Sequence, residues 1–310
     1  MNPILVVGSV ALDSVQTPEG ESTEALGGSA VYFSLAARHF ASVSMVGVVG
    51  TDFPARHREM LVKRGVDVSG LKEVPGKTFR WVGKFGGDMN KAETLDTQLN
   101  VFETFDPRLT DVQKGCPVVF LANIDPDLQR GVLDQMQAPK LVACDTMDFW
   151  IGSKKPAIKK LLSRVDVLFI NDEEARELSG RRNNVLAARR LSEWGPGVVV
   201  VKKGEHGALL LAQGRVFPFP AYPLDEVKDP TGAGDSFAGG FMGAMSSAPE
   251  SRDVGALKRA LVCGIAVSSL NVGAFGTRRL EELDAAAIEA RCRSYLELLD
   301  VSFSGIAAVA

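Results

Sequence analysis

The chain has 310 residues, 45% of them hydrophobic and 24% charged, with a formal net charge of −3. This composition is typical of a globular protein that buries a substantial core, and the lack of a basic excess argues against a nucleic-acid partner. The opening MNPILVVG lacks the basic segment of a signal peptide, and no apolar run approaches the roughly 18–20 residues that span a bilayer, so we expect a cytoplasmic protein without a membrane partner.

Cysteine and histidine spacing argues against a zinc site. The four cysteines contain no C-x-x-C pair, and none of the three histidines stands in a metal-ligand spacing. We therefore expect reduced thiols, as in a cytoplasmic protein.

The first elements are those of an α/β protein. Residues 4–7 are a continuous apolar run, which predicts a strand buried on both faces. Asp13 lies a few residues past this strand, where open α/β sheets bind ligands; a simple turn residue is the alternative. Gly27 and Gly28 precede a helix and let a ligand approach the backbone closely. Next come a helix over 29–40, a strand over 44–49 and a helix over 54–64.

Residues 77–85 alternate with a period of two, which predicts a half-exposed strand. Phe79, Trp81 and Phe85 share one face of it. A turn signal follows at 86–90, and residues 94–105 supply a returning strand. Together, residues 14–25 and 76–104 predict a small β-sheet lid that projects from the main domain. A structural hairpin that covers a sheet edge is the alternative.

From residue 118 strands and helices alternate, which is typical of a parallel sheet with helices on both faces. We predict one α/β domain over 1–310 with a doubly wound, mostly parallel sheet, into which the two lid segments are inserted. The tail 301–310 has no clear periodicity. The predicted strands are 118–124, 141–146, 167–171, 198–201, 208–211 and 215–219, and the predicted helices are 127–137, 154–164, 183–194, 252–271 and 280–299.

Polar residues follow several of these strands. Asn123, Asp145 and Asn171 each stand at a strand end, and Glu174 follows Asn171 by three residues. Carboxylates and amides at one sheet edge suit a hydrated magnesium ion. We expect Asn171 and Glu174 to serve a metal; a first-turn helix acid favoured by the helix dipole is the alternative for Glu174.

The most informative stretch is Asp229-Pro-Thr-Gly-Ala-Gly-Asp-Ser-Phe-Ala-Gly-Gly-Phe-Met-Gly243. Gly232 and Gly234 permit a turn that points backbone N–H groups outward at a helix start, where an anion binds well. Asp235 lies inside this anion cradle, although a carboxylate repels anions. The conflict disappears if Asp235 removes a proton from a hydroxyl while the N–H groups hold a phosphoryl group in transit.

This stretch resembles the second signature of the PfkB/ribokinase family, which contains ATP-dependent kinases of sugars and nucleosides. Gly27-Gly28-Ser29-Ala30 falls where the first signature of that family falls, and the resemblance covers nearly the whole chain. It implies a ribokinase-like fold, a lid over the substrate, ATP and Mg²⁺, and phosphorylation of a hydroxymethyl group. Activation by a monovalent cation stays open. Because the lid pairs with a second subunit in many family members, a homodimer through the lid is a further expectation.

The resemblance also assigns roles to residues. Lys203 to Ala208 is similar to a turn that borders the nucleotide, Gly264 and Ser268 fall where the family lines its adenine pocket, and Asn171-x-x-Glu174 is similar to a metal and phosphate element. The expected site is catalytic Asp235, Gly232, Ala233 and Gly234; substrate-binding Asp13, Gly27, Gly28, Tyr32, Phe79, Trp81 and Asn123; nucleotide-binding Lys203, Gly204, Gly207, Gly264 and Ser268; and metal-binding Asn171 and Glu174.

One departure bears on the substrate. Ribokinase-like members usually carry Asn four residues after the second glycine of the first signature, where it bonds a sugar hydroxyl, and here that position is Tyr32. With the aromatic residues of the lid, this favours a ribonucleoside 5′-hydroxyl over a ribose- or fructose-type sugar. A non-catalytic nucleotide-binding protein is a remote alternative. Neither G-x-G-x-x-G after the first strand nor a Walker motif occurs, which argues against a dinucleotide-dependent oxidoreductase and a P-loop NTPase.

Overall fold

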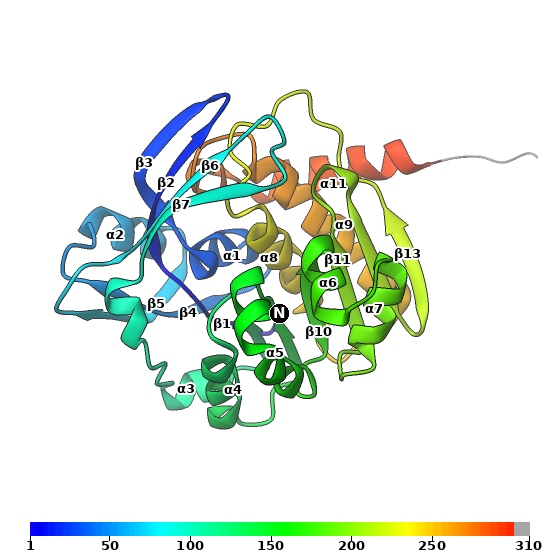
Figure 1. The fold of residues 1–310 in the computed structure, drawn as a ribbon, viewed down its shortest axis with the longest axis horizontal. Coiled ribbons are helices and arrows are strands. Elements are labelled where there is room, and N and C mark those ends of the chain that lie inside the picture. The colour runs from blue at the N-terminus through cyan, green and yellow to red at the C-terminus, as the bar shows by residue number, and fades with distance from the viewer. Residues whose placement is uncertain (301–310) are drawn as a thin grey trace, which may run out of the picture.

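The computed structural model describes residues 1–300, and its larger sheet has the order β13-β12-β11-β10-β9-β8-β1-β4-β5 (Figure 1). From β5 to β11 all neighbours are parallel, and β12 and β13 add an antiparallel hairpin. The strands are β1 (Ile4–Val7), β4 (Val43–Gly50), β5 (Val66–Val74), β8 (Val118–Leu121), β9 (Leu141–Cys144), β10 (Val167–Asn171), β11 (Val198–Lys202), β12 (Ala208–Ala212) and β13 (Arg215–Phe219). The chain winds outward from β1 in both directions, which confirms the predicted doubly wound, mostly parallel sheet. The order reverses between β1 and β8, where such sheets bind their ligands.

Helices cover both faces of this sheet. Strand β1 shows why: Ile4 and Val6 join one apolar core, whereas Leu5 and Val7 join the other, because successive side chains of a strand point to opposite faces. The face of Ile4 and Val6 carries α1 (Ser29–Ala37), α2 (Ala55–Lys63), α8 (Ala233–Met245), α9 (Val254–Asn271), α10 (Arg278–Glu282) and α11 (Ala285–Leu299). The face of Leu5 and Val7 carries α4 (Pro126–Gln135), α5 (Asp148–Leu162), α6 (Asp172–Ser179) and α7 (Asn184–Ser192). The short α3 (Asp111–Lys114) precedes β8.

Small residues bring α1 and α8 together. A Cβ atom on Gly239 of α8 would lie 2.6 Å from the Ala36 Cβ and 2.6 Å from the Phe33 carbonyl oxygen of α1. Only glycine therefore permits this separation of the two helices. The close packing places the start of α1, with its paired glycines, beside the glycine-rich start of α8.

A separate four-stranded sheet with the order β3-β2-β6-β7 forms the predicted lid. Strands β2 and β6 are parallel and the outer pairs are antiparallel. The first lid segment begins earlier than predicted, and the returning strand is shorter, because Gln98 ends β7 and a 3₁₀ helix follows. The elements are β2 (Ala11–Thr17), β3 (Gly20–Gly27), β6 (Phe79–Phe85), β7 (Ala92–Gln98) and η1 (Asn100–Thr104).

Several parts of the fold differ from the sequence prediction. Strand β5 and helix α6 were not predicted, and α5 starts at Asp148, with a kink at Lys154. The predicted helix 280–299 is two helices, because the Asp284 side chain accepts a hydrogen bond from the Ala287 N–H and caps a new helix. The tail 301–310 lies outside the described residues.

Within residues 1–300, one helix is long and apolar enough to cross a membrane by length and composition. It is α9, whose mean hydropathy is 1.2 over 18 residues, and 61% of that window is buried inside the protein. Gly240 of α8 packs against the Cys263 carbonyl of α9. Helix α9 is therefore a core helix of this fold.

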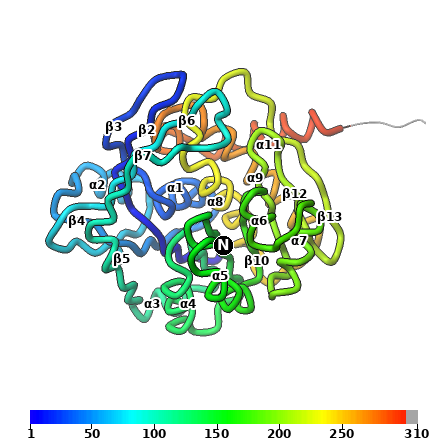
Figure 2. Tube along the Cα trace, viewed as in Figure 1, coloured from blue at the N-terminus to red at the C-terminus, as the bar shows by residue number. Residues whose placement is uncertain are grey.

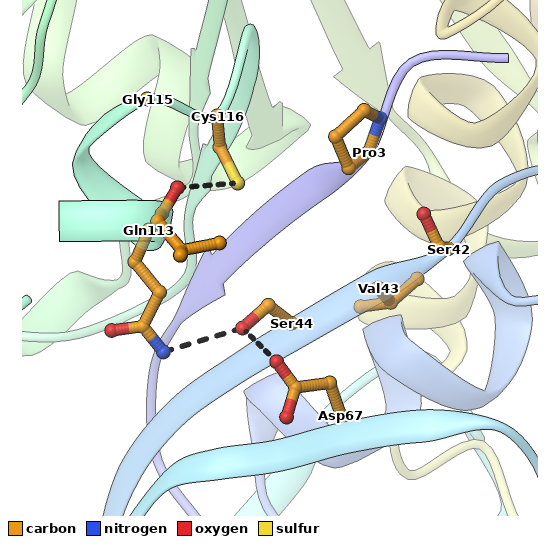
Figure 3. Close-up of a pocket in the computed structure, with 9 residues that line it drawn as sticks. Pro3, Ser42, Val43, Ser44, Asp67, Gln113, Gly115 and Cys116 are labelled. Atoms are coloured by element: carbon orange, nitrogen blue, oxygen red, sulfur yellow. Dashed lines mark hydrogen bonds between the residues drawn. The ribbon is translucent and has the colours of Figure 1, made fainter. Parts of the chain in front are cut away.

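A cavity of about 180 Å³ lies at the amino ends of the central strands (Figure 3). The Gln113 Nε2 donates to the Ser44 Oγ at 3.3 Å, and the Ser44 Oγ donates to the Asp67 Oδ2 at 2.8 Å. Ligands of parallel α/β sheets bind at the opposite edge, beyond the carboxyl ends of the strands. This cavity is therefore separate from the predicted site.

Candidate active site

The carboxyl edge of the larger sheet gathers the predicted polar residues. Asp145 directly follows β9, and the register of the parallel pair β10 and β11 places Asn171 beside Lys202. The Lys202 Nζ lies 2.6 Å from the Asp145 Oδ2. Asp145 is buried and the Lys202 side chain is 18% exposed. An ion pair so placed is shielded from water and holds both side chains at the strand ends.

The direction of Lys202 follows from strand alternation. Val198 and Val200 point into the core beneath α1 and α8, so Lys202 continues the same face, while Lys203 continues the opposite one. Accordingly, a Cβ atom added to Gly234 of α8 would lie 2.9 Å from the Lys202 Nζ. Glycine at this position leaves the space that the ammonium group occupies at the helix start.

The glycine-rich turn before α8 has the expected left-handed backbone at Gly232 but not at Gly234, which lies inside the helix without a positive φ. Gly232 precedes the helix with φ of 71°, a left-handed conformation that favours glycine. Asp229 fixes the turn from below, since its two carboxylate oxygens accept hydrogen bonds from the N–H groups of Thr231 and Gly276. The Ala233 N–H donates to the Pro230 carbonyl at 3.1 Å, so in this form that group has a partner within the turn. The anion-binding roles of Gly232, Ala233 and Gly234 remain predictions.

Asp235 lies in the first turn of α8 and is partly exposed. The burial of its carboxyl group and, second, the charge of Asp145 together raise its pKa to about 7, while Lys202 opposes the shift. A carboxylate with a pKa near neutrality can accept a proton from a hydroxyl and release it again. This protonation behaviour suits a general base, and the catalytic role of Asp235 remains a prediction.

Asp13 lies against the paired glycines at the start of α1. A Cβ atom on Gly27 would lie 1.9 Å from the Asp13 Oδ2, and Gly28 has φ of 96°, so both positions require glycine. Burial raises the pKa of Asp13 to about 7, the Gly28 N–H opposes this shift, and Asp229 and Asp235 add to it. The charge of Asp235 thus contributes to the raised pKa of Asp13.

Tyr32 lies beneath the cradle. A Cβ atom on Gly232 would lie 2.2 Å from the Tyr32 ring, and Tyr32 is 2% exposed. Burial raises the pKa of Tyr32, and Asp13 adds to the shift. The ring therefore offers no open face on which a substrate base could stack in this form, contrary to the role that we expected for it.

Asn171 and Glu174 form a capping box at the start of α6. The Asn171 Oδ1 accepts from the Glu174 N–H at 2.8 Å, and the Glu174 Oε2 accepts from the Asn171 N–H at 3.0 Å. Burial raises the pKa of Glu174 to about 8, and the nearby Asp145 adds to it while Lys202 opposes it. Glu174 is thus an acid in the first turn of a helix, which was the alternative to a metal ligand. The metal role of Asn171 and Glu174 remains a prediction.

The turn that follows β11 is tightly constrained. Gly204–His206 form a short 3₁₀ helix, and the Lys203 N–H donates to the Gly207 carbonyl at 2.8 Å. Gly207 has φ of 83°, and a Cβ atom there would lie 2.0 Å from the Phe219 carbonyl oxygen. The glycines predicted to border the nucleotide therefore also have local structural reasons to be glycine.

The model of the pfkB family of carbohydrate kinases matches residues 1–283. The chain belongs to this family.

Named relatives agree with this assignment. The chain is 31% identical to a cytidine kinase from Thermococcus kodakarensis over 257 residues, which is 79% of this chain and 89% of that protein. Among solved structures, it is similar to a nucleoside kinase from Methanocaldococcus jannaschii, with a TM-score of 0.76, 20% identity and coverage of 95% of this chain and 99% of that one. It is equally similar in fold to a fructokinase from Vibrio cholerae, with a TM-score of 0.76, 19% identity and coverage of 94% and 99%.

The aromatic residues of the lid separate into two groups in this pfkB-family chain. Phe79 stacks on Phe102 of η1 with ring centroids 5.2 Å apart, and Phe85 is buried. Trp81 is half-buried, its ring lies over Gly83, and its Nε1–H donates to the Thr94 Oγ1 at 3.2 Å. The common aromatic surface that we expected is therefore reduced to Trp81, with Phe79 supporting the base of the lid.

Three further predicted residues lie near the edges of the site. The Asn123 Nδ2 lies 3.0 Å from the Met147 sulfur, and its Oδ1 is buried without a hydrogen-bond partner among residues 1–300. Gly264 is a packing position, because a Cβ atom there would lie 2.9 Å from the Phe237 carbonyl oxygen of α8. Its role in the adenine pocket, like that of the partly exposed Ser268, rests on the family resemblance alone.

Two residues outside the predicted site make contacts beside it. The sequence leaves open whether Lys202 or Lys203 approaches the ATP phosphates or whether both are a solvated strand end, and the alternation of Val198 and Val200 decides their faces only once α8 is placed on one face of the sheet. The sequence predicts Asn90 only as part of a turn. In the structure Asn90 contacts Gly204 and Glu205, and Glu205 lies 115 residues further along the chain. No local pattern indicates a contact at that separation.

Proposed function

We propose that this pfkB-family kinase transfers the γ-phosphoryl group of ATP to the 5′-hydroxyl of a ribonucleoside. The observation that carries the chemistry is the arrangement at the start of α8, where Asp235, the glycine turn and the Lys202 ammonium meet. A base, a set of anion-binding N–H groups and a fixed cation are what phosphoryl transfer requires of a protein.

The reaction needs one proton acceptor. The acceptor hydroxyl gives its proton to the Asp235 carboxylate as its oxygen forms a bond to the γ-phosphorus, and the bond from that phosphorus to the β–γ bridging oxygen breaks. Asp13 would accept hydrogen bonds from the hydroxyl groups of the acceptor, a role that its burial beside Gly27 and Gly28 supports. Their shared burial keeps both carboxyl groups near the protonation equilibrium at neutral pH.

We assign Lys202 to binding of the γ-phosphoryl group during its transfer. Its Nζ is held by Asp145 at 2.6 Å and lies beside Gly234, at the start of the helix where the anion cradle opens. Asp145 and Glu174 outweigh the effect of burial and keep the pKa of Lys202 above its usual value. The side chain is therefore a permanent positive charge at the place where negative charge develops in the transition state.

The acidic residues of the edge fit a magnesium ion that comes with ATP. Within residues 1–300, no three histidine, cysteine or acidic side chains form a ready ligand set, which agrees with an ion that keeps several waters and takes ligands from phosphates. Asp145 and Glu174 would hold it through that water shell, with Asn171 fixing Glu174 by the capping box. Bound there, magnesium would neutralise charge on the β- and γ-phosphates.

A nucleoside is favoured over a free sugar by the lid and by the relatives. The register of β2 and β6 places Trp81 directly beside Asp13, so an indole ring for stacking stands next to a carboxylate for hydroxyl binding. Stacking of a base on such a ring contributes roughly 0.5–1.5 kcal/mol beyond burial. The cytidine kinase named above and a nucleoside kinase from Methanothermobacter thermautotrophicus, 26% identical over 262 residues, support the same substrate class.

The test is a competition assay with ATP and Mg²⁺. Cytidine, adenosine, inosine, ribose and fructose compete for the wild-type enzyme, and mass spectrometry identifies each phosphorylated product. We expect the highest kcat/KM for a nucleoside, and a larger rise in KM for that nucleoside than for ribose in Trp81→Ala, with Trp81→Phe intermediate. A higher kcat/KM for a free sugar than for every nucleoside would refute the nucleoside assignment and leave the kinase assignment intact.

Two further proposals concern the setting of the enzyme. All four cysteines are free in residues 1–300, which supports a reducing compartment such as the cytoplasm. Strand β7 is an edge of the lid sheet, and its Leu95 side chain is 50% exposed, which supports pairing of two lids in a homodimer. Leu95→Asp should then shift the protein to a monomer in analytical ultracentrifugation, and an unchanged sedimentation coefficient would contradict this interface.

A further inference from the structure

The tip of the lid reaches the turn after β11, which we expect to border the nucleotide. The Glu205 N–H donates to the Asn90 Oδ1 at 3.1 Å, and the Asn90 Nδ2 donates to the Glu205 Oε1 at 3.2 Å. Figure 2 shows the β6–β7 hairpin extending across the molecule toward the segment that follows β11. The lid therefore contacts the far side of the site as well as covering the acceptor side.

The two partners are shaped for this contact. A Cβ atom on Gly204 would lie 1.9 Å from the Asn90 Oδ1 and would displace the Asn90 side chain, and the φ of 54° at Gly204 favours glycine there. On the lid side, the Asp88 Oδ1 accepts hydrogen bonds from both the backbone N–H and the Nδ2 of Asn90, at 2.9 and 2.8 Å. These bonds orient the Asn90 amide so that its oxygen faces the turn.

A second contact supports the first. The Lys91 Nζ lies 3.0 Å from the Glu173 Oε2 in the first turn of α6, next to Glu174. Both side chains are well exposed, at 70% and 59%, so this pair contributes little by itself. It shows, however, that the lid tip spans two elements of the nucleotide side, the turn after β11 and the start of α6.

We propose that Asn90 is a positioning residue that couples nucleotide binding to acceptor binding, a role that rests on the proposed kinase function. The hairpin that carries Trp81 beside Asp13 ends in Asn90 on the nucleotide turn, so one rigid strand pair touches both binding regions. An acceptor that favours the closed lid thereby favours the ordered turn, and a bound nucleotide favours the closed lid. Linkage requires the effect to be equal in both directions.

The experiment measures this coupling directly. Binding of the non-hydrolysable ATP analogue AMP-PNP with Mg²⁺ is measured by calorimetry with and without a saturating acceptor, taken as the best substrate of the competition assay. The ratio of the two dissociation constants is the coupling factor. In Asn90→Ala we expect this factor to fall about five-fold, with the dissociation constant for AMP-PNP alone unchanged, and the ratio of ATP hydrolysis to phosphoryl transfer to rise.

The matched control is Gln98→Ala, on the same hairpin, whose amide donates to the Asp96 Oδ2 within the lid. It should retain the wild-type coupling factor. A wild-type factor in Asn90→Ala, or an equal loss of AMP-PNP affinity with and without acceptor, would overturn the proposal, since the second result indicates a purely structural role. If the best acceptor proves to be a sugar, the nucleoside assignment fails while this measurement, made with that sugar, still decides the role of Asn90.

Discussion

The two edges of the central strands both carry polar networks, but their carboxylates differ in character. At the amino edge, partial burial acts to raise the pKa of Asp67, and hydrogen bonds from the Ser69 N–H and the Ser44 hydroxyl outweigh it, so the pKa lies below its ordinary value. At the carboxyl edge, burial and Asp145 raise the pKa of Asp235 to about 7 despite Lys202. A carboxylate that accepts hydrogen bonds stays ionised at neutral pH and serves the structure. A buried carboxylate with few hydrogen-bond donors has a pKa near neutrality and can take part in proton transfer.

The largest expected effect separates the two edges by activity. Asp235→Asn preserves the shape of the side chain and removes its ability to accept a proton. We expect kcat to fall by about 10²–10⁴, while ATP binding survives because the cradle is unchanged. Asp67→Asn, made in parallel at the amino edge, should leave kcat near wild type. Near-wild-type turnover in Asp235→Asn would show that Asp235 is only a helix-start residue.

The second comparison uses two lysines at opposite edges of the larger sheet, Lys202 at the carboxyl end of β11 and Lys140 before the amino end of β9. Lys202 pairs with Asp145, which follows β9, while Lys140 pairs with Glu250 at 3.7 Å on the surface. Lys202→Met should lower kcat by about 100-fold, the usual cost of losing one preorganised group that stabilises transition-state charge. Lys140→Met should have no effect on steady-state kinetics. Equal kinetics for the two variants would contradict the role of Lys202.

The two carboxylates should also differ in stability. The folded-state pKa of Asp235 is raised, so its stabilising contribution is present at low pH and is lost as pH rises through about 7. At pH 8, Asp235→Asn should therefore raise the free energy of unfolding, by about 1–3 kcal/mol. Asp67→Asn should lower it at the same pH, because the lowered pKa of Asp67 favours the folded state above its titration range. Urea unfolding at pH 8 measures both, and a common sign would refute the contrast.

The smallest effect concerns the metal. Glu174→Gln keeps an acceptor for the Asn171 N–H, and Gln also serves in a capping box, so the helix start is preserved while the carboxyl group that would ionise beside a bound metal is removed. We expect the Mg²⁺ concentration for half-maximal activity to rise roughly ten-fold, with little change in the KM for the acceptor. A magnesium titration that matches wild type would leave Glu174 with its capping role only.

Much of the fold could be predicted because local patterns specify it. The continuous apolar runs of β1, β8, β10 and β11 are what strands buried on both faces require, and the glycine-rich start of α8 is unusual enough to indicate its chemistry. Strand β5 was missed because it is a half-exposed edge strand with Gly70 in its middle, which weakens the pattern. Helix α6 is short, and the sequence indicated it only through the alternative interpretation of Glu174 as a first-turn acid.

The parts of the site that could not be predicted depend on which face a helix covers and on distant contacts. Lys202 and Lys203 are equivalent in the sequence, and only the position of α8 distinguishes them. Tyr32 stands at a family substrate position, yet the close packing of α1 on α8 turns its ring under Gly232. The contact of Asn90 with Glu205 joins residues far apart in the chain. The contact of Asn90 with Gly204, which explains the glycine at that position, is likewise visible only in the structure.

The most direct test of the account is the pH dependence of kcat/KM for phosphoryl transfer in the wild type and in Lys202→Met. Because Asp235 must be ionised to accept a proton, activity should fall as pH drops below about 7. Lys202 lowers the pKa of Asp235 and is not among the groups that shift the pKa of Asp13, so its removal should move the acid limb to higher pH. An acid limb that stays at the same pH in the variant, or that is absent from the wild type, would contradict the assignment of Asp235 as the base.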